Sequence, residues 1–219
     1  MTDLAPASPT EDAVGIGLSE AALLRIADAI ATAEAKTSAE IRVVVAQAPL
    51  VQHPFFSVLW ASLAALVLPW LVVLVRPMPS LTTLTVQAVL FVVIAAVLML
   101  PSVAPRVVPR LALKAAARSA AIETFLAYGI PQTAGRTGIL IYAAARERLV
   151  EVVADEGVHT PLGHGAWQEI CGAVASRARQ GSLADGLVCG VEKAGELLSG
   201  ALPRGPDDRN ELSNHVIVL

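Results

Sequence analysis

Two long apolar runs inside the chain constrain its fold more than any other feature. These runs are Phe55–Val75 and Leu81–Leu100, both free of Asp, Glu, Lys and Arg, and only Arg76–Ser80 separates them. Each run has about 20 residues, and an α-helix that rises about 1.5 Å per residue then crosses roughly 30 Å of hydrocarbon. The pattern predicts two transmembrane helices, residues 55–75 and 81–100, joined as a hairpin.

Basic residues are unevenly distributed around this hairpin. Four basic residues follow the hairpin: Arg106, Arg110, Lys114 and Arg118. Lys36 and Arg42 precede it, and only Arg76 lies in its turn. Loops next to a span that are rich in Lys and Arg stay in the cytoplasm. We therefore expect a cell inner membrane protein with both termini and the soluble domain in the cytoplasm and the turn outside.

The rest of the chain predicts one α/β domain that the hairpin interrupts. Residues 18–50 predict a helix capped by Ser19 and a β-branched strand over Glu40–Ala46. Residues 105–200 predict a helix that ends at Gly129, a strand hairpin over Gly138–Ala145 and Leu149–Ala154, a loop over 157–165 and two helices. The second of these helices has a capping-box start, Ser182 with Asp185. Residues 201–219 form a C-terminal tail with a short apolar end.

Residues 1–17 are acidic and proline-containing, and they lack the basic and apolar regions of a secretory leader. We expect a disordered tail and no cleaved signal peptide. The formal net charge of the whole chain is -3, which does not indicate nucleic-acid binding.

Two groups of charged residues are candidates for a site. Arg106, Arg110, Lys114 and Arg118 are spaced by four and share one helix face. They indicate either a solvated face beside anionic lipid headgroups or a specific contact with a phospholipid or an acidic partner. Glu151, Asp155 and Glu156 lie at the end of a predicted strand and could contribute oxygen ligands to Ca²⁺ or Mg²⁺, or form a solvated strand end.

Histidine and cysteine give weaker signals. His159 and His164 lack a clear third ligand, so they make a poor zinc site. Cys171 and Cys189 fall on apolar helix faces, which predicts buried free thiols. Cys171 has no evident His and acid partners that would make it a nucleophile.

The ordered set of segments resembles the TPM domain family, which is named after a thylakoid lumen protein, a photosystem II repair protein and a modulator of an acetylcholine receptor. The matching segments are Leu23–Ala46, Arg136–His159, the helix around Trp167, Gln180–Leu198 and the tail from Asp208. The chain is most similar to a membrane-bound bacterial branch in which a two-helix hairpin follows the first helix and strand.

The resemblance implies an α/β/α sandwich with a small mixed sheet. It also implies two functional classes, because some members are weak acid phosphatases or bind calcium through acidic loops, whereas others are accessory modules of membrane complexes. The Asp that soluble members carry before the first helix is replaced by Val14–Leu18. Their acidic loop after the strand hairpin reads Val158–Pro161 here.

These observations predict an interaction module that works with other membrane proteins. The alternative is a metal-assisted, phosphatase-like hydrolase that uses Ca²⁺ or Mg²⁺. A convergent group of carboxylates separates the two hypotheses, because only the hydrolase requires one.

Overall fold

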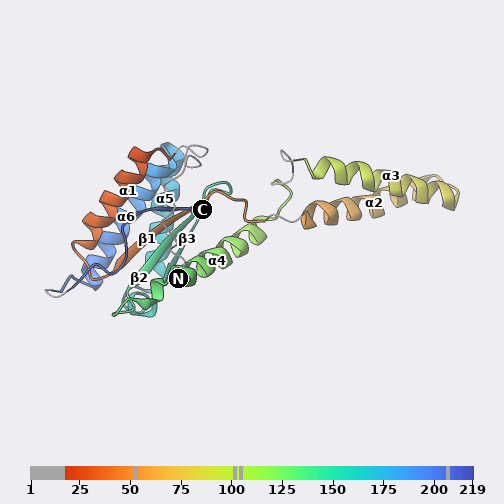
Figure 1. Cartoon of the computed structure of the whole chain (residues 1–219). Helices are drawn as coiled ribbons and strands as arrows, with labels where there is room; N and C mark the ends of the chain where they lie inside the picture. Colours follow the sequence, from red (N-terminus) through yellow and green to blue (C-terminus); the bar gives the residue numbers. More distant parts are fainter. Residues whose placement is uncertain (1–17, 52–53, 101–102, 104–105, 206–207) are drawn as a thin grey trace, which may run out of the picture. The chain divides into compact units, whose positions relative to one another are not determined.

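The computed structural model describes residues 18–51, 54–100, 103, 106–205 and 208–219 (Figure 1). Residue contacts divide the chain into two compact units. Unit 1 combines the chain before Val51 with Ala116–Leu219, and unit 2 is Val51–Ala115. The expected disordered tail over residues 1–17 lies outside the described residues.

A four-stranded mixed sheet forms the centre of unit 1, in the order β3-β2-β1-β4. Its strands are β1 (Glu40–Ala46), β2 (Gly138–Ala144), β3 (Leu149–Ala154) and β4 (Ile217–Val218). β1 pairs in parallel with β2 and with β4, whereas β2 and β3 form an antiparallel hairpin. The prediction of a mixed α/β fold with a small mixed sheet is therefore confirmed. The segments before and after unit 2 belong to one sheet, because β1 and β2 pair along their full lengths.

Helices cover both faces of this sheet. Side chains alternate along each strand, so Ile41, Val43 and Val45 face one side and Val44 and Ala46 the other. The first face packs against α1 (Glu20–Glu34), α5 (Glu156–Gln180) and α6 (Leu183–Ala201). The second face packs against the C-terminal half of α4 (Arg110–Ala127) and the short helix η3 (Ile130–Gln132). Every residue of β2 is buried as a result.

The predicted helix caps are present. Ser19 accepts a hydrogen bond from the backbone N–H of Ala22, and Ser182 and Asp185 form a complete capping box at the start of α6. α1 and α6 pack closely, because a Cβ atom added to Gly195 would lie 2.8 Å from the Cβ of Ala33. Gly195 therefore permits the close approach that brings α1 into the core.

Unit 2 contains the two apolar helices α2 (Phe55–Val75) and α3 (Ser80–Leu98), which pack side by side as a helical hairpin. The buried residues of α2 recur every four positions and are small or compact: Ser57, Ala61, Ala65 and Pro69. Such a stripe lets two helices approach closely. The Ser57 hydroxyl also donates a hydrogen bond to the carbonyl of Leu98 at 2.9 Å.

One prediction for the C-terminal half was wrong. Residues 157–165 are not a loop, because α5 begins at Glu156 and is interrupted only at Gly163, where φ is 70°. The carboxylate of Asp155 caps the first turn by accepting the N–H of Glu156, so the helix starts despite the nearby glycines. The short apolar end of the C-terminal tail forms the edge strand β4 beside β1.

Candidate functional site

The apolar hairpin exposes most of its large side chains. Only 17% of the most apolar window of α2 is buried, and only 11% of that of α3. Leucine, valine and tryptophan side chains face outward along both helices, for example Leu66, Trp70, Leu74, Val89 and Val92. By length and composition both helices are able to cross a membrane. The buried stripe of small residues faces the partner helix, so the two sides of α2 have different compositions.

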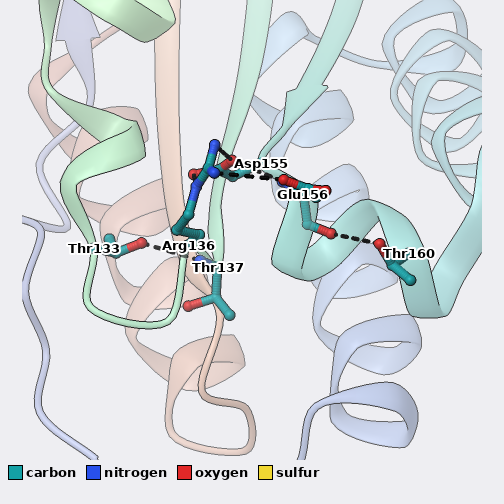
Figure 2. Close-up of polar contacts among 6 residues, drawn as sticks. All are labelled: Thr133, Arg136, Thr137, Asp155, Glu156 and Thr160. Carbon is teal, nitrogen blue, oxygen red and sulfur yellow. Dashed lines mark hydrogen bonds and ion pairs between the residues drawn. The ribbon is translucent and has the colours of Figure 1, made fainter.

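Asp155 and Glu156 lie at the junction of β3 and α5, where Arg136 contacts both (Figure 2). Arg136 Nη2 donates to Asp155 Oδ1 at 2.9 Å, Arg136 Nε donates to Asp155 Oδ2 at 3.3 Å, and Arg136 Nη1 lies 3.4 Å from Glu156 Oε2. The side chain of Asp155 is only 5% exposed. The hydrogen bond to Asp155 raises the pKa of the Arg136 guanidinium. Arg136 thus engages both oxygens of Asp155, and the first N–H of α5 also donates to Oδ1.

The backbone at this junction is tightly packed. Arg136 has a φ of 50°, and its carbonyl accepts the N–H of Gly157 at 3.1 Å. A Cβ atom on residue 157 would lie 2.5 Å from the carbonyl oxygen of Gly135. Only glycine fits there, so the start of α5 is fixed against the turn that carries Arg136.

Glu151 contacts a different arginine. It lies on the face of β3 that is covered by α4, and its Oε2 is 3.8 Å from Arg118 Nη1. Arg118 also donates to the carbonyl of Val152 at 2.7 Å. Among the residues that the structure describes, no three His, Cys, Asp or Glu side chains group as possible metal ligands. Glu151 therefore has a different arginine partner from Asp155 and Glu156.

The predicted basic face is only partly available to a ligand. Arg118 is engaged by β3 through Val152 and Glu151. Arg110 and Lys114 lie in the first two turns of α4 and are exposed. Arg106 precedes α4, is exposed and has an interaction of its own. The four basic residues are therefore not equivalent, although their spacing in the sequence suggests that they are.

The thiol and imidazole groups have structural surroundings. Cys171 and Cys189 are free and half-buried. Burial raises the pKa of the Cys171 thiol to about 11, so it stays protonated at neutral pH. Nδ1 of His159 accepts a hydrogen bond from the indole N–H of Trp167 at 3.0 Å. The side chain of His164 lies outside the described part of the chain.

A buried polar cluster joins the C-terminal segment to the sheet, and no pattern in the sequence indicates it. Glu34 and Glu40 are buried, and Glu40 accepts the backbone N–H groups of Glu211 and Leu212 at 3.1 and 3.2 Å. Arg42 donates to the carbonyl of Ser213. These contacts join residues about 170 positions apart, beyond the reach of any local pattern.

An open groove of about 530 Å³ lies between α1 and α6. Ala29, Ala33 and Val188 provide its apolar surface. Charged side chains of both signs also line it: Arg25, Asp28, Lys36, Glu192 and Glu196. Arg25 also forms an ion pair with Asp185 at 2.9 Å. The mixture of charges fits an extended polar segment better than a small apolar ligand.

A solved structure is similar to this chain across most of its length. It is the NMR structure of the BA42 protein from the psychrophilic bacterium Bizionia argentinensis, with a TM-score of 0.61 and 20% sequence identity. The match covers 94% of this chain and 98% of that chain. No protein-family model and no curated protein matches the sequence. At this level of identity the likeness shows a shared fold alone.

Proposed function

We propose that this protein is a membrane-anchored α/β module that acts as an accessory or interaction partner of other membrane proteins. The observation that carries the proposal is the apolar hairpin, whose large side chains face outward. In water, two such helices would expose an apolar patch far larger than soluble monomers tolerate. In a bilayer the same side chains contact lipid, and a helix satisfies most of its backbone hydrogen bonds internally.

Neither a soluble core helix nor a secretory signal fits α2 and α3 as well as a membrane hairpin does. A core helix of a soluble protein is mostly buried, but α2 and α3 are 17% and 11% buried over their most apolar windows. A secretory signal lies close to an N-terminus, whereas α2 begins only at Phe55 and follows a helix and a strand of the α/β unit. The small-residue stripe of α2 is also typical of helix pairs within membranes.

The distribution of basic residues supports a cytoplasmic position for the α/β unit. Arg106, Arg110 and Lys114 follow the second apolar helix, whereas the turn of the hairpin carries only Arg76. This asymmetry favours an inner membrane protein with both flanks inside. The proposal includes membership of the TPM-like, membrane-bound group, which rests on the order of the segments and on the α/β/α arrangement of unit 1.

The arginine contacts of the acidic residues support an interaction role over hydrolysis. Asp155 and Glu156 contact Arg136, whereas Glu151 of β3 lies near Arg118. A metal-assisted hydrolase needs several oxygen ligands directed at one point. The groove between α1 and α6 instead offers a surface with both charges, which suits a polar segment of a partner.

Membrane extraction tests the anchoring part of this proposal. The full chain should stay with the membrane in alkaline carbonate and in urea and should be released by a mild detergent. The double variant Leu66→Arg, Val92→Arg places two charges on outward-facing positions, each costing about 3 kcal/mol of insertion free energy, and should weaken membrane retention. Leu24→Arg adds the same charge to an exposed position of α1 and serves as the matched control. A wild-type chain that carbonate removes would contradict the proposal.

Association is tested separately. In a mild detergent, the chain from its native membrane should migrate on native gels as an assembly larger than one chain with its detergent. Charge reversal in the groove, Glu192→Lys with Glu196→Lys, should shift the assembly towards the single chain, whereas Glu20→Lys, outside the groove, should not. Migration as a single chain in every case would contradict the interaction role while leaving the anchor intact.

A further inference from the structure

The outer face of α4 carries an exposed apolar stripe that no element of the described chain covers. Leu111 is 82% exposed, Ile122 40% and Leu126 63%. At 100° per residue these three positions and Ala115 fall within an arc of roughly 60°. A different face of the helix packs on the sheet, through buried residues: Ala117, Ala121, Thr124 and Phe125. The stripe is therefore continuous along the helix and independent of the core.

Positive charge lies near the N-terminal end of this apolar stripe, and Lys114 falls about 60° from Leu111 around the helix. Arg110 and Lys114 are exposed in the first two turns of α4, and the only acidic residue of the helix is Glu123. Arg118 is held by the carbonyl of Val152, so it fixes the rotation of α4 against β3. An apolar stripe accompanied by Lys and Arg is the pattern of a helix that lies in the surface of an anionic bilayer.

The connection to the hairpin is short enough for this helix to reach the proposed membrane. α3 ends at Leu98 and α4 begins at Arg110. The intervening segment spans at most about 40 Å even when fully extended. The first turn of α4 therefore lies within about 40 Å of the end of the second apolar helix, a distance from which it can reach the anionic headgroups of the cytoplasmic leaflet.

We infer that the outer face of α4 binds the surface of an anionic phospholipid bilayer, with Leu111, Ile122 and Leu126 buried below the headgroups and Arg110 and Lys114 contacting lipid phosphates. This inference rests on the proposed membrane hairpin. It gives the α/β unit a second attachment, which holds the unit against the membrane instead of leaving it tethered by the connection alone. Two attachments bind a bilayer more firmly than either does separately.

Depth-dependent fluorescence quenching tests the inference on the full chain. Cys171 and Cys189 are replaced by serine, and a single cysteine at Leu126 carries an environment-sensitive fluorophore. The protein is reconstituted in phosphatidylcholine vesicles with or without phosphatidylglycerol, and the quencher is a lipid with a nitroxide high on its acyl chain. Retained protease resistance shows that the cysteine-free chain is folded. Leu71→Cys in α2 reports on the hairpin, and Glu196→Cys on α6 is an exposed control outside α4.

The expected result is quenching at residue 126 in anionic vesicles and none at residue 196. Arg110→Gln with Lys114→Gln, or the omission of phosphatidylglycerol, should reduce quenching at residue 126 by about twofold or more and leave residue 71 unchanged. If the label at residue 71 is quenched but the label at residue 126 is not, the inference is overturned, and the proposed membrane hairpin still stands. Quenching at residue 126 that is the same with and without phosphatidylglycerol and in the double variant would also overturn it. Cross-linking of two copies through this position would overturn it as well. A label at residue 71 that is not quenched would contradict the hairpin itself.

Discussion

The carboxylate of Glu34, at the end of α1, accepts the backbone N–H of Ile41 in β1 at 2.8 Å. The side chain is buried, and its second oxygen has no hydrogen-bond partner among the described residues. The groups that face it are the carboxylate of Glu40, the guanidinium of Arg42 and the amide of Asn214 in the C-terminal segment. Burial is the largest influence, and it raises the pKa of Glu34 from 4.5 to about 7.

Replacing Glu34 with glutamine should change how stability depends on pH. Between about pH 4.5 and pH 7 the native state holds a proton that the unfolded chain has lost, so the free energy of unfolding falls as pH rises. The loss is complete above pH 7 and amounts to about 3 kcal/mol. Glu34→Gln cannot ionise and keeps an oxygen for Ile41, so it should be more stable than wild type at about pH 8 and similar at about pH 4.

Urea titrations of both proteins across this range give the comparison. Burial also raises the pKa of Glu40, so the variant should keep part of the wild-type slope. Parallel curves for the two proteins from acidic to alkaline pH would show that Glu34 does not titrate in this window.

The second prediction concerns the packing of α1 on the rest of unit 1. Ile26 is fully buried among residues of α6 and the sheet, whereas Leu24 on the same helix is 58% exposed. Ile26→Asp buries an unpaired charge and should lower the free energy of unfolding by roughly 3 kcal/mol or more. Leu24→Asp should change it by less than about 1 kcal/mol. Limited proteolysis and urea unfolding in detergent measure both, and normal protease resistance of Ile26→Asp would mean that the N-terminal segment folds independently.

The third prediction concerns hydrolysis. Because Asp155 is held by Arg136 and caps α5, it is poorly placed to act as a metal ligand or a proton donor. The purified protein should turn over a generic phosphomonoester no faster than its Asp155→Asn and Glu151→Gln variants, with or without added Ca²⁺ or Mg²⁺. These substitutions keep size and remove charge. Turnover that is present in wild type and abolished in either folded variant would favour the hydrolase.

Local features of the fold were predictable from the sequence. The β-branched run over Glu40–Ala46 forms β1 with the same bounds, and the apolar run over Phe55–Val75 forms α2 with the same bounds. Ser182 and Asp185 form the predicted capping box. In each case the residues that determine the element are its own or its immediate neighbours, so periodicity and capping chemistry are sufficient.

Features that depend on distant partners were not predictable in this way. β4 has only two residues and exists because β1 offers an edge to it. The engagement of Arg118 by Val152, and of Asp155 by Arg136, decides which charged residues stay available, and spacing along the sequence does not show it. The glycines of residues 157–165 suggested a loop, but the Asp155 cap and the packing of Gly157 against Gly135 favour a helix.

We propose that the apolar hairpin crosses a membrane with both flanks in the cytoplasm, and a pair of topology reporters tests this claim. A reporter that is active only in the periplasm is inserted at Met78, in the turn between α2 and α3, or fused after Leu219, in a Gram-negative bacterial host. A second reporter that is active only in the cytoplasm is placed at the same two positions as the control. We expect periplasmic activity at Met78 and cytoplasmic activity after Leu219. The reverse pattern, or cytoplasmic activity at both positions, would contradict the claim.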